Sequence, residues 1–399
     1  MGHTWGGWRE QLAEHIRASD IRGIGRLVIT ATTGITDLVE AMHHTVNPLS
    51  PPDPALRTHG VTGAVFRGVR GVIKVVGGAL DLALSPLASL EQAQESSPER
   101  EAVVAALNGV LGDHLQATHN PLAIDMALHS HASEDAPVTG KVAVLVPGLC
   151  MSHRQWLRNG HDHGAALARD QGYTALYLHY NSGLHISTNG RALAEILEQT
   201  LAGWPRPVEQ LVIIGHSMGG LVTRSACHVA ASSGHAWPRH LSKIVFLGTP
   251  HHGAPLERGG NWFNLILGAT PYAAPFARLG HVRSAGITDL RYGYLLDDEW
   301  ADVDRFAHTP DTRRPLPLPA GVQCFVMAAT RGKRGVSEPL LGAGPGDGIV
   351  PLASALGHHS RPDLRLAVPE SQQWIGHGMN HLDLLSRPEV YAQLQDWLA

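Results

Sequence analysis

Residues 210–220 read Gln-Leu-Val-Ile-Ile-Gly-His-Ser-Met-Gly-Gly, and this stretch indicates the fold more clearly than any other part of the chain. The apolar run Leu211–Ile214 is typical of a buried strand, and a helical pattern follows the glycines. Gly215 and Gly219 stand two residues on either side of Ser217. A sharp strand-to-helix turn exposes such a serine, and small flanking residues let the two backbones approach each other. The pattern therefore predicts a nucleophile elbow with Ser217 at its tip.

Short apolar runs alternate with helical segments on both sides of this elbow. Strands that alternate with helices of this length are typical of a parallel sheet with helices on both faces. We therefore expect an α/β fold with a mostly parallel sheet of six strands. The predicted strands are Lys141–Val146, Tyr173–His179, Gln210–Ile214, Leu241–Leu247, Val322–Ala328 and Leu364–Val368.

The composition of the chain changes near residue 135. Residues 1–135 have a helical pattern, so we predict a helical N-terminal extension there and a catalytic domain over residues 136–399. About seventy residues separate Leu247 from Val322, which is too long for a plain loop in a compact domain. We therefore predict a cap or lid insertion at about residues 253–320, placed over the carboxyl edge of the sheet.

Composition excludes several classes of protein. The chain has 399 residues, of which 43% are hydrophobic and 17% charged, so it can bury a large core. The formal net charge is -4 without a basic run, and we expect no nucleic-acid partner. Cys150, Cys227 and Cys324 have neither metal nor redox spacing. The N-terminus lacks the apolar core of a signal peptide, and no stretch is apolar enough to span a bilayer, so we expect a cytoplasmic protein.

Residues 60–87 form an unusual segment within the predicted extension. On a helix its polar positions converge on a stripe about 60° wide, and the remaining surface is apolar or small. Such a helix either packs against the catalytic core, which we favour, or lies on a membrane surface as a peripheral contact. The polar stripe consists of Arg67, Arg70, Lys74, Asp81 and Ser85.

A serine nucleophile needs backbone donors for the negative charge that acyl transfer creates on the substrate oxygen. The residue after the nucleophile, Met218, is expected to supply one N–H at the positive end of the following helix. The second donor usually comes from the loop after an earlier strand. Residues 146–150, Val-Pro-Gly-Leu-Cys, fit that loop, and we assign the second oxyanion-hole donor to Leu149.

The acid and the base are expected to follow the serine in that order. Asp347 follows the predicted strand Val322–Ala328 and lies between two glycines, which suits a loop that directs a side chain inward. Its rivals lie earlier, in the predicted cap: Asp297, Asp298, Asp302 and Asp304. After the last predicted strand only His377 and His381 can be the base, and spacing alone favours His381 weakly.

Taken together, these stretches resemble bacterial α/β-hydrolase lipases and esterases, similar to the GPI inositol-deacylase branch. The resemblance covers residues 141–399. It is carried by residues 146–149, 180–186 with 189–190, 215–220, 248–255, 347–351, 381–385 and 388–391.

The resemblance implies an α/β-hydrolase fold and hydrolysis of carboxylic esters, often lipid-like acyl esters. In such proteins the histidine that leads the last motif is the base, which favours His381 over His377. Pro147-Gly148-Leu149 replaces the His-Gly that many relatives carry at the oxyanion loop, so the geometry of the second donor departs from the family pattern. Residues 1–135 lie outside the shared core and look like an extension seen in some bacterial relatives.

The abundant histidines suggest a metal, but their spacing does not. Adjacent residues such as His251 and His252 rarely ligate one ion, so we expect neither a metal site nor a cofactor. His161, His163, His358 and His359 are expected to be solvated loop residues. We assign substrate-binding roles to four residues near the elbow or in the cap: His216, His251, Trp262 and Phe263.

The hypothesis from the sequence is a serine esterase or lipase that works through Ser217, His381 and Asp347 by an acyl-enzyme route, on a small-molecule or lipid-like ester. The same triad also supports an acyltransferase, an amidase or a polyester depolymerase, and the sequence leaves these open. A membrane-associated lipid-binding protein with an inactive hydrolase domain is a further alternative.

Overall fold

The computed structural model describes residues 19–29, 67, 70–71, 96–133, 136–254, 283–301, 304, 310–333 and 346–399. The chain divides into two compact units. Residues 1–100 and 117–122 make up the first unit, and residues 101–116 and 123–399 make up the second. Trp262 and Phe263, most of the segment 60–87 and much of the predicted cap lie outside the described residues.

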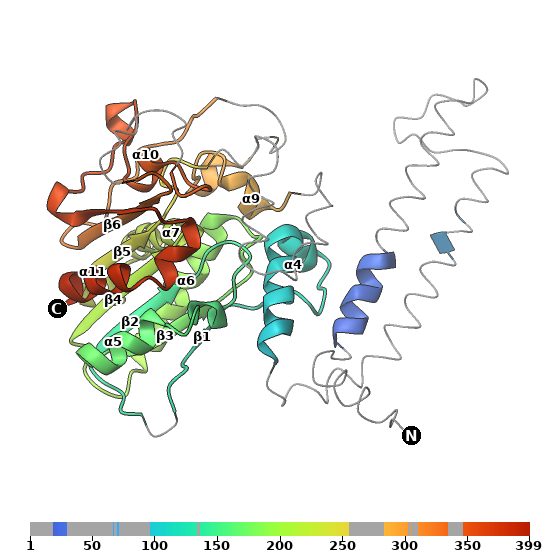
Figure 1. Cartoon of the computed structure of the whole chain (residues 1–399). Coiled ribbons are helices and arrows are strands. Elements are labelled where there is room, and N and C mark those ends of the chain that lie inside the picture. Colours follow the sequence, from blue (N-terminus) through green and yellow to red (C-terminus); the bar gives the residue numbers. More distant parts are fainter. Residues whose placement is uncertain are drawn as a thin grey trace, which may run out of the picture. The chain divides into compact units, whose positions relative to one another are not determined.

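The second unit is built on a seven-stranded sheet with the order β1-β3-β2-β4-β5-β6-β7 (Figure 1). Only β1 runs antiparallel, against β3, and the other six strands are parallel. This sheet and its flanking helices have the α/β-hydrolase fold, as the sequence predicted. The strands are β1 (Ala127–His129), β2 (Lys141–Val146), β3 (Thr174–His179), β4 (Gln210–His216), β5 (Leu241–Leu247), β6 (Gln323–Thr330) and β7 (Gln373–His377).

One predicted strand is wrong. Residues 364–368 form no strand, and the last strand is β7, which pairs with β6 from Val326 opposite Gln373 onward. The apolar side chains of Leu364 and Val368 are buried in the core without joining the ladder, so their pattern imitates a strand. β7 itself lies at the edge of the sheet and is only half-buried, which explains why its sequence lacks a continuous apolar run.

Helices cover both faces of the sheet. α5 and α11 lie on one face, and α6 and α7 lie together on the other (Figure 1). Asp162 caps α5 by accepting a hydrogen bond from the N–H of Ala165 at 2.9 Å, and Gly172 ends the helix in a left-handed conformation. The helices are α4 (Pro98–Ala117), α5 (His163–Gln171), α6 (Ile186–Ala202), α7 (Met218–Ser233), α9 (Ala285–Asp289), α10 (Leu352–Ala355) and α11 (Pro388–Leu398).

The first unit is described only in part. Residues 19–29 are helical, and Asp20 forms an ion pair with Arg100 at 2.5 Å. Asn120 donates a buried hydrogen bond to the carbonyl of Gly23 at 3.0 Å. Among the described residues, no helix combines the length and the apolar character needed to cross a bilayer.

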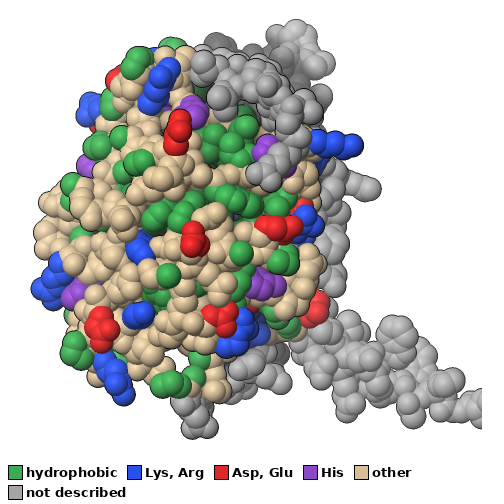
Figure 2. Space-filling model, turned by 60° about the vertical axis from the view of Figure 1, so that its left-hand side comes forward, with side chains coloured by type: hydrophobic (Ala, Val, Ile, Leu, Met, Phe, Trp, Pro, Cys, Tyr) green, Lys and Arg blue, Asp and Glu red, His purple; other side chains and the backbone are tan. Residues whose placement is uncertain are grey.

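Charged side chains on the face of the molecule drawn in Figure 2 are scattered among hydrophobic and neutral groups, and several acidic side chains lie beside basic ones. Lysine and arginine do not gather into a stripe on this face. This face therefore presents no extended field of one sign.

Candidate active site

The turn between β4 and α7 places Ser217 in a strained conformation. Its φ and ψ are 52° and -126°, values that a residue with a side chain rarely adopts. A Cβ added at Gly215 would lie 2.6 Å from the Cα of Gly220, and one added at Gly219 would collide with the carbonyl of Val146. The two glycines therefore let the strand, the helix and the neighbouring loop meet, which is the reason the sequence needs them around the serine.

Asp347 and His381 meet in the core. His381 donates from Nδ1 to Oδ2 of Asp347 at 2.6 Å, and both side chains are 1% exposed. The other oxygen of Asp347 accepts from the backbone N–H groups of Ile349 and Val350 at 2.9 and 2.8 Å. These bonds fix the carboxylate, and the carboxylate fixes the imidazole, so that Nε2 of His381 remains free to face another group.

The imidazole of His381 lies at the carboxyl end of the sheet. A Cβ added at Gly248, the residue after β5, would lie 3.0 Å from Cε1 of His381. Nε2 of His381 is buried and has no hydrogen-bond partner among the described residues. A general base for a serine needs such an unoccupied nitrogen. His377, the rival on spacing, ends β7 and is exposed.

The loop after β2 lies directly against the nucleophile. A Cβ added at Gly148 would lie 2.9 Å from Cβ of Ser217 and 3.3 Å from Nδ1 of His216. Leu149 follows Gly148 in this loop and is 1% exposed, and Met218 begins α7 and is fully buried. The structure therefore brings the segments of both predicted oxyanion donors to Ser217.

Two residues that hold the oxyanion loop were not assigned a role from the sequence. Tyr180 donates from its hydroxyl to the carbonyl of Pro147 at 2.9 Å, and Ser182 accepts from the N–H of Cys150 at 3.0 Å. Both belong to residues 180–183, Tyr-Asn-Ser-Gly, which are part of a stretch that carries the family resemblance. A polar motif directly after a buried strand was the signal that could have identified them.

α4 (Pro98–Ala117) lies before the predicted domain boundary at residue 135, yet it packs against the loops that contain Cys150 and Asn181. A Cβ at Gly109 would collide with Sγ of Cys150, and one at Gly112 would collide with Oδ1 of Asn181. Asn181 donates to the carbonyl of Gly112 at 2.9 Å. β1, which also precedes residue 135, pairs with β3. Residues before 135 therefore support the sheet edge and the loop that faces Ser217.

The predicted substrate-binding histidines have different positions. His216 is fully buried, and its Nε2 donates to the carbonyl of His381 at 3.3 Å. Burial, together with neighbouring His381, holds the pKa of His216 well below its ordinary value, so it packs as a neutral ring. His251 lies instead in the wall of a cavity of about 320 Å³ that Arg224 and His252 also line. None of Ser217, Asp347 and His381 lines that cavity.

His163 was expected to be solvated, and this prediction is wrong. The ring is fully buried, donates from Nε2 to the carbonyl of Leu384 at 2.9 Å, and stacks on Tyr391. Burial lowers its pKa to about 4, so the ring is neutral near pH 7. His163 therefore ties the start of α5 to the segment that carries His381, a role that loop position alone did not reveal.

The sequence of this chain is similar to one known protein family. Residues 137–323 match the family described as the PGAP1-like alpha/beta domain, which confirms the predicted resemblance. No curated protein sequence matches the chain.

Among solved structures, the lipase BlEst2 of Bacillus licheniformis in its mature form is 18% identical. The match covers 68% of this chain and 98% of that one, with a TM-score of 0.44. A lipase-esterase related protein from Clostridium acetobutylicum is 12% identical, with 68% and 98% covered and a TM-score of 0.36. EstA from Clostridium botulinum is 13% identical, with 67% and 88% covered and a TM-score of 0.38.

Proposed function

We propose that this chain, whose residues 137–323 match the PGAP1-like alpha/beta domain family, is a serine hydrolase that cleaves carboxylic esters. The observation that carries the proposal is the buried hydrogen bond from His381 to Asp347, at the same edge of the sheet as the strained Ser217. A fixed acid–imidazole pair at the same sheet edge as a serine on a sharp turn supports nucleophilic catalysis rather than simple binding.

In the proposed first step, Nε2 of His381 takes the proton of Ser217 while the serine oxygen attacks the carbonyl carbon of the ester. Asp347 stays ionised and stabilises the imidazolium that forms. The N–H groups of Met218 and Leu149 receive the negative charge on the carbonyl oxygen. His381 then returns its proton to the departing alkoxide, which leaves as the alcohol, and the acyl group remains on Ser217.

In the second step a water molecule takes the place of the alcohol. His381 removes one proton of that water, the hydroxide oxygen attacks the acyl carbon, and the second tetrahedral intermediate forms under the same N–H donors. Collapse of the intermediate breaks the bond to Ser217, and His381 protonates the serine oxygen. The products are the carboxylic acid and the original enzyme, so no cofactor is consumed.

The apolar content of the predicted cap bears on the length of the acyl chain that this enzyme would prefer. The segment 253–320 contains a run of apolar side chains around residues 262–267, which suits a medium or long acyl chain. Turnover of p-nitrophenyl esters with C4 and C12 acyl groups tests this, and we expect the longer ester to have the higher kcat/KM. A strong preference for C4 would overturn the chain-length proposal while leaving the hydrolase proposal intact.

We propose that the protein is cytoplasmic. We also propose that residues 60–87 are the segment through which it would contact a membrane surface. The apolar surface of the predicted helix, with Arg67 and Arg70 on its polar stripe, suits an anionic bilayer surface. Flotation of the full chain with phosphatidylcholine–phosphatidylglycerol vesicles tests the contact. Arg67→Glu combined with Arg70→Glu is expected to reduce flotation, and a wild-type chain that does not float would dismiss the contact.

The experiment that tests the function itself is hydrolysis of p-nitrophenyl butyrate and laurate by the wild type and by Ser217→Ala, with fluorophosphonate labelling alongside. We expect turnover to fall to the background of the uncatalysed reaction and labelling to disappear. Ser217→Ala that retains wild-type turnover would mean that the elbow is not the catalytic centre. Release of acid rather than transfer to an added alcohol separates hydrolysis from acyl transfer.

A further inference from the structure

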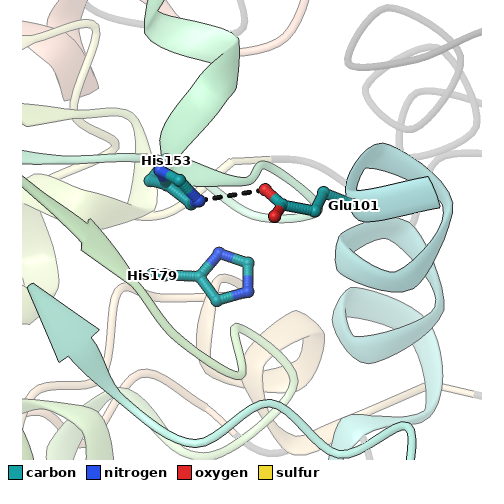
Figure 3. A group of neighbouring side chains, drawn as sticks. All are labelled: Glu101, His153 and His179. Atoms are coloured by element: carbon teal, nitrogen blue, oxygen red, sulfur yellow. Dashed lines mark ion pairs between the residues drawn. The ribbon is translucent and has the colours of Figure 1, made fainter. Parts of the chain in front are cut away.

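Three side chains from distant parts of the sequence converge beside the oxyanion loop. Glu101 comes from α4, His153 from the short 3-10 helix His153–Trp156 after that loop, and His179 from the end of β3 (Figure 3). One ligand atom from each residue lies within 4.8 Å of the other two. All three residues belong to the second unit of the chain.

The cluster is sheltered from solvent. His153 is 4% exposed, and the side chain of Glu101 is 13% exposed. Nε2 of His153 lies 2.9 Å from Oε2 of Glu101, and Nε of Arg154 lies 3.2 Å from the same oxygen. Nδ1 of His179 is buried and has no hydrogen-bond partner among the described residues. A nitrogen of the His179 ring faces the pair formed by the other two (Figure 3).

We propose that Glu101, His153 and His179 bind a divalent transition-metal cation, and that zinc matches this ligand set best. Two imidazoles and one carboxylate are a set that zinc takes in proteins, with a fourth position for water. At ligand distances of about 2.0–2.1 Å, ligand atoms in a tetrahedral site lie about 3.3 Å apart. The ligand atoms of the cluster, which lie within 4.8 Å of one another, are already close to this spacing.

Neighbouring rings complete the environment that a metal-binding histidine usually has. Nδ1 of His153 lies 2.8 Å from Nε2 of His131, so the nitrogen turned away from the cluster is hydrogen-bonded and the ring orientation is fixed. His129 stacks on His153 with ring centroids 4.1 Å apart.

Glu101 brings the negative charge. A carboxylate is the anionic member of this ligand set and balances part of the charge of a divalent cation. The spacing of the histidines in the sequence predicts no metal site, because these three ligands lie far apart in the chain and meet only in the tertiary structure.

The position of the site assigns the cation a structural role. His153 lies three residues beyond Cys150 of the oxyanion loop, and His179 directly precedes Tyr180, whose hydroxyl bonds the carbonyl of Pro147. Glu101 lies on α4, whose Gly109 packs against Cys150. A bound cation would fasten α4, the oxyanion loop and β3 to one another. Binding of the cation does not depend on the proposed ester hydrolysis, whereas its effect on turnover does.

Metal content of the full chain, freed of any affinity tag, is the test. After incubation with Zn²⁺ and removal of excess metal, we expect one tightly bound equivalent in the wild type. Glu101→Gln and His179→Asn are expected to lose that equivalent, and His358→Asn, a half-buried histidine outside the cluster, is expected to keep it. Equal zinc content in all four proteins would overturn the proposal, because the metal would then sit on other histidines.

Two measurements on the wild type do not depend on whether the variants fold. Zn²⁺ in excess over EDTA-treated protein is expected to raise Tm by about 3 °C or more. Co²⁺ added in place of zinc is expected to give the intense visible absorption of a tetrahedral site. A wild type that shows neither the shift nor the absorption would overturn the proposal. If zinc binds and ester turnover is absent, the metal site stands and the hydrolase proposal fails.

Discussion

At the scale of single residues, the candidate site depends on the environments of three side chains. Ser217 lies on a turn that strains its backbone and is only 3% exposed, and His381 and Asp347 are almost completely buried. Two backbone N–H groups and one imidazole nitrogen satisfy the carboxylate. Three donors hold this carboxylate in place. Replacement of Asp347 by the neutral amide is therefore expected to lower kcat more than it lowers the free energy of unfolding.

Asp347→Asn tests the role of the acid. A neutral amide cannot stabilise the imidazolium and favours the wrong tautomer of His381, so we expect kcat to fall by a factor on the order of 10⁴ with little change in KM. Asp298→Asn, at a rival position that is half exposed and paired with Arg314, is the control and should keep activity within about twofold. An Asp347→Asn enzyme with a tenth or more of wild-type kcat would exclude the assignment.

Gly148→Ala tests the contact between the oxyanion loop and the nucleophile. The added methyl group would lie 2.9 Å from Cβ of Ser217, so the loop must shift and its N–H donors lose their alignment. We expect kcat/KM for a p-nitrophenyl ester to fall on the order of 10²-fold. Gly203→Ala is the matched control, because its φ is -89° and its nearest neighbour would be 3.6 Å away. Equal activity of the two variants would show that the loop does not contribute.

At the scale of elements, hydrogen bonds between strands and loops position the site. The hydroxyl of Tyr180, directly after β3, fixes the carbonyl of Pro147 directly after β2. The hydroxyl of Tyr173, directly before β3, lies 3.1 Å from the carbonyl of Leu398 and 3.2 Å from Oε1 of Gln210 at the other end of that strand. The two tyrosines therefore make the same type of bond at opposite ends of the sheet.

This symmetry gives a matched pair of substitutions, Tyr180→Phe and Tyr173→Phe. Each removes a hydrogen bond to a buried carbonyl, and we expect each to lower the free energy of unfolding by about 1–2 kcal/mol in denaturant titration. Of the two, only Tyr180→Phe is expected to lower kcat, by roughly tenfold, because Tyr180 contacts the oxyanion loop and Tyr173 does not. Similar kcat values for the two variants would separate the loop from catalysis.

At the scale of the whole molecule, buried neutral histidines make the fold sensitive to acid. Burial lowers the pKa of His163 to about 4, whereas its unfolded value is near 6.5. Between these values the unfolded chain binds the proton and the folded chain does not. The stability that His163 contributes is complete above pH 6.5 and is lost as the pH falls toward 4.

Thermal unfolding of the wild type and of His163→Gln across pH 4–8 tests this dependence. We expect the wild type to lose stability steadily below pH 6.5. His163→Gln should be less stable near neutral pH but lose less on acidification, by up to about 1.4 kcal/mol per pH unit, because one proton no longer couples to unfolding. Parallel pH profiles for the two proteins would mean that His163 is not the coupled group.

The sequence by itself predicted the elbow at Ser217, the residues of the parallel strands up to β6, and an aspartate and a histidine that follow them as acid and base. These features can be predicted because each depends on a few adjacent residues: an apolar run indicates a strand, two glycines indicate the sharp turn, and a polar loop can present an acid or a base. The domain boundary at residue 135 and the cap at 253–320 stay predictions.

Tertiary structure alone decided the rest. Residues 364–368 resemble a strand in sequence because a buried loop and a buried strand both need apolar side chains. Only backbone hydrogen bonds to a neighbouring strand distinguish the two, and they form in the tertiary structure. The support of the oxyanion loop by Gly109 of α4, and the meeting of Glu101, His153 and His179, join segments far apart in the chain. No local pattern encodes such contacts, because they exist only once the folded backbone has closed the distance between their segments.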